Sequence, residues 1–511
     1  MMIVGQKMKV LLINPPFHRL KDFGHTYYPL GLGYLCAIGN KIGVETKIYN
    51  AEAAAINENL NHSENYNEKI KSHKKYVAAI RDDEHYVWKE VKDVINKYLP
   101  DVVGITVLTA KYASALKISE IVKNIGGGHI KVVWGGQHPT ICPEEVMNES
   151  PVDFAVLGEG EETFSELLTE FKKGGNNFKD IKGLAYKKSA IIQINLLRKL
   201  TDNLDIFPFP DRENLIYPER YFADSFGNMI TLRGCSFLCG YFSAKSIWSR
   251  KVRYRSVDNV IAEIQKIKEE YGSKNFYFWD DSFTLNRKRV VDICNILIAK
   301  SINIKWGCTT RVDLLDEDIL SLMKKAGCDY ISIGIESGSE RILKIIEKNI
   351  SIKQIKKAIE MIKSCKIPFE AFFMIGFPDE TADDIEKTFQ LMKEIDGGTV
   401  CFSIFTPYPG SAQFDTAKRH GLIPEKINWS DYSHQSSENY FVKDISKEKF
   451  REYVDKFSRW ADLKNTKDLK IGRLFLKAMN ELPSLIKRPA IAFHKGKTLL
   501  SVFKKKLIAS I

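Results

Sequence analysis

The residues best suited to chemistry are two cysteines, Cys235 and Cys239, which share one loop with three residues between them. The loop follows a strand-like run at 229–232, which Arg233-Gly234 ends. Of the nine cysteines in the chain, only this pair is closely spaced, which argues against a disulfide framework and for a reducing compartment. Thiols in this pattern are either ligands of a metal centre or ordinary buried thiols.

Residues 231–254, TLRGCSFLCGYFSAKSIWSRKVRY, resemble the cluster loop of radical S-adenosylmethionine enzymes. That family places three cysteines at spacings of three and two, so that three irons of a [4Fe–4S] cluster take thiolates and the fourth binds S-adenosylmethionine. An electron from the cluster then releases a 5′-deoxyadenosyl radical. The resemblance implies that Cys235 and Cys239 are the catalytic, metal-binding ligands. The third position is Phe242.

Phe242 leaves several interpretations open. A complete cluster would need its missing ligand from water, substrate or a distant cysteine such as Cys308, because no cysteine lies between Cys239 and Cys294. If instead the cluster is lost or incomplete, the protein is a non-catalytic cofactor-binding subunit or scaffold.

The composition is that of an ordinary globular protein, and the sequence predicts no membrane-spanning helix. The chain has 511 residues, 44% hydrophobic and 27% charged, enough for two or three domains. It contains no apolar run of about 18 residues, and its start does not read as a signal peptide, so we expect a cytoplasmic location. The net charge of +12 comes mostly from the end of the chain: twelve Lys and Arg against two acidic residues from Lys464 onward. The nearly neutral body argues against nucleic-acid binding.

Short apolar strands alternate with helical stretches in the first third of the chain. The strands are expected at 10–13, 46–49, 101–108, 130–134 and 154–157. This alternation predicts an α/β fold with a parallel, doubly wound sheet, whose ligands bind at the carboxyl ends of the strands. Residues 51–100 interrupt the pattern with a polar stretch that we expect to be an inserted helical excursion, with helix at 76–98.

The strand ends carry a second resemblance. NPP, PLGLGYL, GGQHPT, PEE and GEGEETF together resemble the cobalamin-binding domain fused to one class of radical S-adenosylmethionine enzymes. Glycines there suit a flat corrin ring, which needs close backbone approach. The alternative is a generic nucleotide-binding fold whose glycines only make turns. The chain lacks Asp-x-His-x-x-Gly, so that motif does not supply a cobalt ligand; His25 is a weak pocket candidate. The expected cobalamin-site residues are Asn14, Pro15, Thr106, Gly135, Gly136, His138, Thr140, Gly158 and Glu159.

Strand and helix alternate again after the cysteine loop. Further strands are expected at 275–279, 304–308, 330–335, 369–374 and 400–405, and helices are capped by Ser256, Asp316 and Ser351. With the strand before the cysteines, this gives six or more βα units and predicts a partial or complete (β/α) barrel whose site lies at the C-terminal strand ends.

Polar groups follow these strands, and the resemblance implies roles for them. GIESGS resembles the element that contacts S-adenosylmethionine, through Glu336 and Ser337, and MIGFPDET the element near adenine, at Ile375 and Gly376. Arg311 is expected to pair with the cofactor's carboxylate as a planar fork. WDDSF adds Asp280 and Asp281. For any one of these residues, a helix cap or a surface ion pair is the alternative.

The resemblances imply a cobalamin-dependent radical S-adenosylmethionine enzyme that methylates an unactivated carbon or phosphorus. The expected divisions are 1–170 (cobalamin-binding, Rossmann-like), 171–218 (hairpin and linker), 219–425 (radical barrel) and 426–511 (basic, helical). We expect a small-molecule or lipid-like substrate and a reductant such as flavodoxin or ferredoxin. The basic tail is either a helical cap on the barrel or a peripheral membrane contact.

Overall fold

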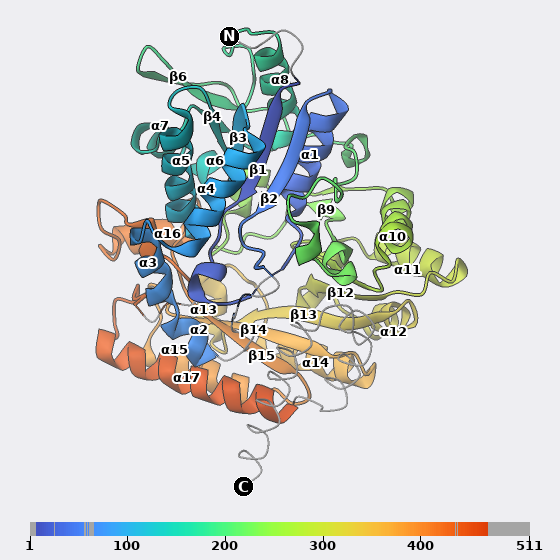
Figure 1. Ribbon diagram of the computed structural model, residues 1–511. Helices are drawn as coiled ribbons and strands as arrows, with labels where there is room; N and C mark the ends of the chain where they lie inside the picture. Colours follow the sequence, from blue (N-terminus) through green and yellow to red (C-terminus); the bar gives the residue numbers. More distant parts are fainter. Residues whose placement is uncertain are drawn as a thin grey trace.

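The computed structural model describes residues 7–468, apart from residues 25, 56, 57, 59, 61–65, 435 and 437. Two sheets dominate it, one in the N-terminal lobe and one in the lower lobe, and the chain passes once from the first to the second (Figure 1). Both His25 and the basic segment 469–511 lie outside the described residues.

The N-terminal lobe is built on a seven-stranded sheet of order β2-β1-β3-β4-β5-β6-β7. Its first five strands are parallel, as the sequence predicts, and their interior positions are buried. They are β1 (Lys9–Asn14), β2 (Glu45–Asn50), β3 (Val102–Thr106), β4 (Lys131–Gly135) and β5 (Phe154–Val156). The connecting helices include α1 (Leu30–Lys41), α4 (Tyr86–Tyr98), α5 (Tyr112–Gly126), α6 (Gln137–Ile141), α7 (Pro143–Glu149) and α8 (Gly160–Lys172).

The predicted hairpin is present, but it extends this sheet. Strands β6 (Leu184–Lys188) and β7 (Ile191–Ile194) add to it antiparallel, with β6 beside β5. The first sheet therefore continues past residue 170, into the segment 171–218 that the sequence analysis describes as hairpin and linker. Alternating patterns show that strands exist, but they do not show which sheet edge accepts them.

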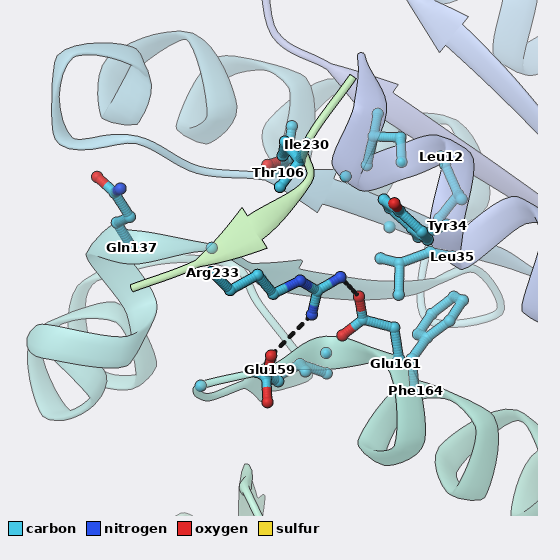
Figure 2. A pocket seen from close by; sticks show the side chains of 18 of the residues that line it. Leu12, Tyr34, Leu35, Thr106, Gln137, Glu159, Glu161, Phe164, Ile230 and Arg233 are labelled. Atoms are coloured by element: carbon cyan, nitrogen blue, oxygen red, sulfur yellow. Dashed lines mark hydrogen bonds and ion pairs between the residues drawn. The ribbon is translucent and has the colours of Figure 1, made fainter. Parts of the chain in front are cut away.

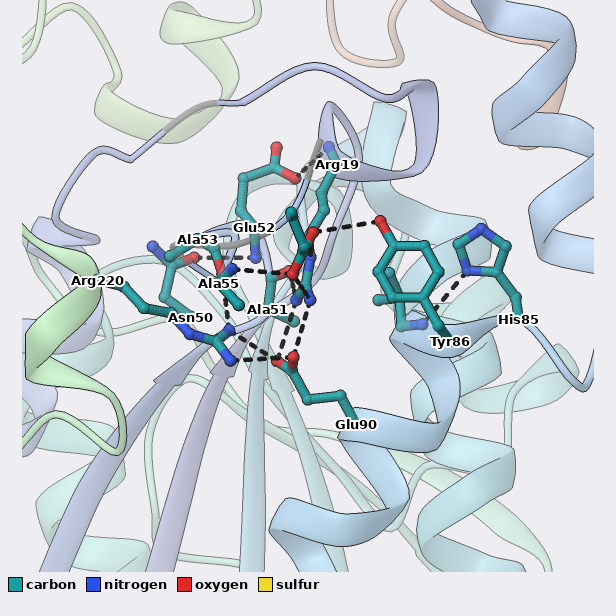
Figure 3. Close-up of polar contacts among 12 residues, drawn as sticks. Arg19, Asn50, Ala51, Glu52, Ala53, Ala55, His85, Tyr86, Glu90 and Arg220 are labelled. Carbon is teal, nitrogen blue, oxygen red and sulfur yellow. Dashed lines mark hydrogen bonds and ion pairs between the residues drawn. The ribbon is translucent and has the colours of Figure 1, made fainter. Parts of the chain in front are cut away.

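The polar interruption forms the helices α2 (Tyr66–Lys71) and α3 (His73–Arg81), followed by α4. The predicted single helix at 76–98 is broken between α3 and α4, where the acidic run Asp82-Asp83-Glu84 precedes His85 at the start of α4. Helix α4 carries Glu90 into a largely buried network with Arg19, Glu58 and Arg220 (Figure 3). This network fastens the segment after β1 to the interlobe connection.

The second lobe is a parallel six-stranded sheet of order β15-β14-β13-β12-β11-β8, an open form of the predicted barrel. Its strands are β8 (Asn228–Met229), β11 (Asn275–Phe278), β12 (Lys305–Thr310), β13 (Cys328–Glu336), β14 (Phe369–Ile375) and β15 (Thr399–Ile404). The predicted strand at 229–232 is split: β8 joins this sheet, whereas β9 (Leu232–Arg233) pairs antiparallel with β10 (Arg253–Tyr254).

The predicted helix caps of this lobe are confirmed. Ser256, Asp316 and Ser351 each accept a hydrogen bond from a backbone N–H in the first turn of α10 (Val257–Tyr271), α12 (Glu317–Lys325) and α14 (Ile352–Ser364). The other helices are α9 (Ala244–Trp248), α11 (Arg287–Ala299), α13 (Glu340–Ile345), α15 (Ala382–Glu394) and α16 (Ala412–Arg419).

The helix α17 (Lys447–Asp468) packs across β15 at the bottom of the molecule, next to α2 (Figure 1). Phe450, Tyr453 and Phe457 bury their rings there, as a helical cap requires, and Asn465 Oδ1 accepts a 2.9 Å hydrogen bond from Val400 N. Within the described part of the chain, no helix combines the length and apolar character needed to cross a bilayer.

Candidate active site

A cavity of about 320 Å³ lies where the two lobes meet (Figure 2). One wall consists of the strand ends of the N-terminal lobe, including Thr106, and the start of α1. The opposite wall is the segment that leads into the cysteine loop, with Ile230, Leu232, Arg233 and Gly234. Trp248, Trp279 and Asp281 complete it. The cavity thus brings the two chemically distinctive motifs of the sequence face to face.

Glycines form part of the first wall and expose the backbone to the cavity there. Gly135, Gly136, Gly158 and Gly160 all line the cavity. Gly158 has a φ of 76°, and a Cβ placed there would meet no atom within 4 Å, so it would project into open space. At Gly136, φ is 116° and a Cβ would stand 2.9 Å from the Val107 carbonyl oxygen. Such a wall fits a flat macrocycle that approaches the backbone closely.

A buried ion cluster joins the two lobes at the cavity edge. Arg233, directly before the cysteine loop, pairs with Glu159 at 2.8 Å and also with Glu161, as Figure 2 shows. Arg253 pairs with the other Glu159 oxygen at 2.6 Å. Burial acts to raise the pKa of Glu159, but Arg253 and Arg233 outweigh it and the pKa is lowered. The GEGEETF motif therefore holds the base of the cysteine loop in addition to lining the cavity.

The loop presents two half-buried thiols and one exposed ring. Burial is the main reason why the pKa of Cys235 is raised. Arg311 donates to Cys239 Sγ at 3.5 Å and lies 3.7 Å from the centre of the Phe237 ring. Phe242, at the third position, is 58% exposed.

The distant cysteine considered as a third ligand is poorly placed. Cys308 is fully buried within β12, and this burial is the main cause of the raised pKa of its thiol. The residues present therefore fit two thiolate ligands of an iron–sulfur cluster, and Cys308 does not complete the set.

Behind the loop, the GIESGS glutamate is held in a buried triad. Glu336 accepts hydrogen bonds from Tyr241 Oη at 2.8 Å and Lys348 Nζ at 2.9 Å. Its φ is 68°, an uncommon conformation for a residue with a side chain, which is maintained where surrounding contacts impose it. The triad ties the end of β13 to Tyr241, one residue before Phe242. Arg311 reaches the same region by donating to the Lys348 carbonyl oxygen at 2.7 Å.

Several predicted site residues have structural contacts instead of cavity positions. Asp280 accepts from the backbone N–H groups of Thr231 and Leu232, which shapes the strand before the loop. Ser337 is buried 3.1 Å from Thr388 Oγ1. Gly376, which follows the buried Ile375, has a φ of 96° and packs against Phe450.

In the N-terminal lobe, Asn14 accepts from Lys111, and Pro15 is buried. Thr140 bridges the two glycine turns, because its hydroxyl donates to the Gly136 carbonyl and accepts from Gly158 N–H. His138 lies outside the cavity lining, in a buried cluster with Thr109. Thr106, Gly135, Gly136, Gly158, Glu159 and Asp281 are the predicted residues that the cavity brings together.

The sequence analysis missed some residues that the geometry makes prominent. Arg233, Tyr34, Trp248 and Trp279 line the cavity, and Lys348 contacts Glu336. The position of Arg233 directly before the cysteine loop was the available signal for it. Tyr34 lies within the PLGLGYL motif but was not singled out in it, and nothing in the sequence marked Lys348, because its partner lies in another element.

Models of two protein families match the chain on either side of this cavity. The B12 binding domain matches residues 19–168 and the Radical SAM superfamily matches residues 229–392. An uncharacterized methyltransferase of Pyrococcus horikoshii is 34% identical over 431 residues, which cover 83% of this chain and 86% of that protein. The chain belongs to the cobalamin-binding radical S-adenosylmethionine family.

Other members of the family agree in sequence and fold. The cytidylyl-2-hydroxyethylphosphonate methyltransferase of Streptomyces wedmorensis is 26% identical, over 82% of this chain and 83% of that protein. The cobalamin-dependent radical enzyme OxsB with aqua-cobalamin bound has the same fold, with a TM-score of 0.67 at 16% identity over 97% of this chain and 72% of that one. The radical methyltransferase TsrM from Kitasatospora setae, with tryptophan and an S-adenosylmethionine analogue, gives a TM-score of 0.62 at 15% identity, over 81% and 77%.

The family's cofactors are cobalamin, S-adenosylmethionine and a [4Fe–4S] cluster. Here the glycine wall fits the first of these. Cys235 and Cys239 would hold the third, with two thiolates in place of the usual three.

Proposed function

We propose that this protein is a cobalamin-dependent radical enzyme that transfers a methyl group to an unactivated carbon or phosphorus centre. The observation that carries the proposal is the shared cavity: glycine turns of the B12 binding domain form one wall, and the segment leading to Cys235 and Cys239 forms the other. The sequence relatives support methyl transfer, since the proteins of Pyrococcus horikoshii and Streptomyces wedmorensis are both named as methyltransferases.

The chain's own residues would bind and orient the cofactors. Gly158 leaves room for a planar ring, and Thr140 fixes the spacing between its turn and the turn at Gly136. Arg233, through Glu159, keeps the cysteine loop against that wall. When bound, the cofactors would supply the electron, the radical and the methyl group, while the protein orients the substrate and keeps water away.

Arg311 is proposed to serve the S-adenosylmethionine site. Its guanidinium is buried beside Cys239, to which Nη1 donates, while Nε and Nη2 pair with the two oxygens of Asp313 at 2.9 and 3.0 Å. The Nε–Nη2 fork therefore already holds a carboxylate, and the Nη1 edge beside Cys239 is the part left to meet the carboxylate of the cofactor. Glu336 and Ser337 are proposed to shape the same site through the end of β13.

The substrate is proposed to be a small or lipid-like molecule, and the electron donor a flavodoxin or ferredoxin in the cytoplasm. The cavity wall opposite the glycines is aromatic, with Trp248 and Trp279, which suits an apolar reacting group. The proposed membrane contact of residues 469–511 lies outside the described residues.

Cleavage of S-adenosylmethionine tests the proposal. The protein is purified without oxygen, reconstituted with iron, sulfide and cobalamin, and reduced, and 5′-deoxyadenosine and S-adenosylhomocysteine are measured. We expect both products from the wild type and neither from Cys239→Ala, with Cys365→Ser as a thiol control away from the loop. Product in Phe242→Cys alone would mean that the natural chain is a degenerate, non-catalytic homologue.

A further inference from the structure

A second group of potential metal ligands lies outside the cavity, on α6 and α7. His138, Cys142 and Glu145 place one nitrogen, one sulfur and one oxygen atom within 4.8 Å of one another. In the part of the chain that the structure describes, this is the one group of three or more His, Cys, Asp or Glu side chains with such proximity. None of the three lines the interlobe cavity.

His138 carries the strongest indication of a ligand. Its side chain is fully buried, and Nδ1 lies 3.1 Å from Thr109 Oγ1. Its Nε2 is also buried but has no hydrogen-bond partner, and the nearest acidic atom, Glu145 Oε1, is 3.8 Å away. Leaving a buried polar atom unpaired is destabilising, so an occupant that accepts this lone pair would be stabilising.

The surroundings hold the three groups in place. The rings of Tyr112 and Trp429 enclose the imidazole, with centroids 4.8 Å and 5.2 Å from it. Trp429 Nε1 also donates to Glu145 Oε1. A hydrogen bond to the second imidazole nitrogen and one to the carboxylate are the contacts that orient metal ligands in proteins.

We propose that His138 Nε2, Cys142 Sγ and the Glu145 carboxylate bind one zinc-type divalent cation, with water in the fourth position. Imidazole, thiolate and carboxylate are the ligands of Zn²⁺, whereas Ca²⁺ and Mg²⁺ prefer oxygen alone. Tetrahedral zinc bond lengths place ligand atoms roughly 3.3–3.7 Å apart, so atoms that lie within 4.8 Å of one another would approach by up to about 1.5 Å. Cys142 would bind as thiolate and release its proton to solvent.

The site joins the cobalamin-binding lobe to the segment after the barrel. Trp429 begins the short helix Trp429–Asp431, far along the chain from α6 and α7, and its indole contacts two of the three proposed ligands. A cation here would cross-link α6 to α7 directly and support the Trp429 contact through Glu145.

Cobalt binding tests the proposal, since a thiolate–Co²⁺ bond has a characteristic near-ultraviolet charge-transfer band. The full chain carrying Cys235→Ala and Cys239→Ala is titrated with Co²⁺ and then Zn²⁺, so that the cysteine loop cannot compete. We expect one equivalent of cobalt with the band, displaced by zinc. Adding Cys142→Ser should abolish the band, and adding His138→Gln should weaken binding at least tenfold.

Cys365→Ser in the same background is the matched control, because Cys365 is also partly exposed but lies at the end of α14. It should keep the band. The proposal is overturned if the parent binds no cobalt, or if Cys142→Ser and Cys365→Ser bind it equally. Because a ligand variant could lose its fold, two independent readouts are added. One is cobalt binding by Glu145→Gln, and the other is the zinc-dependent rise in melting temperature of the parent.

Discussion

Replacing Arg233 with methionine should destabilise the junction between the lobes far more than removing an exposed arginine. Arg233 pairs with Glu159 and Glu161, and the side chains of these three residues are 12%, 6% and 8% exposed. Methionine leaves Glu159 with Arg253 but leaves the Glu161 carboxylate buried without its cation. Removing one partner of a buried pair costs about 3–5 kcal/mol, and since only one carboxylate is orphaned we expect about 3 kcal/mol.

The matched control is Arg287→Met. Arg287 pairs with Asp316 at 3.0 Å, but these side chains are 55% and 50% exposed. Exposed pairs contribute about 0–1 kcal/mol, so the control should lose no more than that. The free energy of unfolding is measured by urea titration followed by far-UV circular dichroism.

A double variant separates the orphaned charge from lost packing. Arg233→Met with Glu161→Gln removes the buried carboxylate charge and should recover about 1–2 kcal/mol of the loss. The reasoning is refuted if Arg233→Met and Arg287→Met lose equal stability, or if the double variant is no more stable than Arg233→Met alone.

Of three further predictions, two concern the cofactor sites and one concerns the buried carboxyl group of Glu380. Gly158→Val should weaken cobalamin binding at least tenfold in an absorbance titration. The control Gly272→Val, at a position with a similar φ of 68° and equally open surroundings but away from the cavity, should bind cobalamin normally. Equal cobalamin binding by the two variants would contradict the assigned cavity. Phe242→Cys should retain more iron after chelator treatment than the wild type, by elemental analysis, because a third thiolate is added; unchanged retention would place the ring outside ligand reach. Burial raises the pKa of Glu380 to about 8, above its unfolded value. The contribution of this carboxyl group to stability is therefore full below about pH 4.5 and is lost as pH rises through about 8, by up to about 1.4 kcal/mol per pH unit. The melting temperature of the wild type relative to Glu380→Gln should fall between pH 6 and about 8, and parallel curves for the two proteins would contradict this.

Local signals in the sequence predict much of the fold. Ser256, Asp316 and Ser351 cap the expected helices because a cap needs only a side chain and the N–H groups of the next turn. Glycines at the ends of β4 and β5 likewise mark the cavity wall, because the lack of a Cβ has the same consequence in any tertiary context.

The misses come from contacts between distant segments. A polar side chain after a strand can face the cavity or form hydrogen bonds with the backbone. Asp280 accepts from nearby N–H groups, and Thr140 donates to a carbonyl oxygen. His138 packs against Trp429, almost 300 residues later in the chain, so no local pattern fixes its direction. The importance of Arg233 depends on how the two lobes meet, which periodicity does not encode.

The most direct test of the central claim is the cobalamin and iron content of one anaerobically reconstituted sample of the full chain. The account predicts one cobalamin per chain, together with iron that Cys235→Ala and Cys239→Ala remove while cobalamin stays bound. A wild-type protein that takes up neither cofactor, or whose iron is unaffected by losing both thiols, would contradict it.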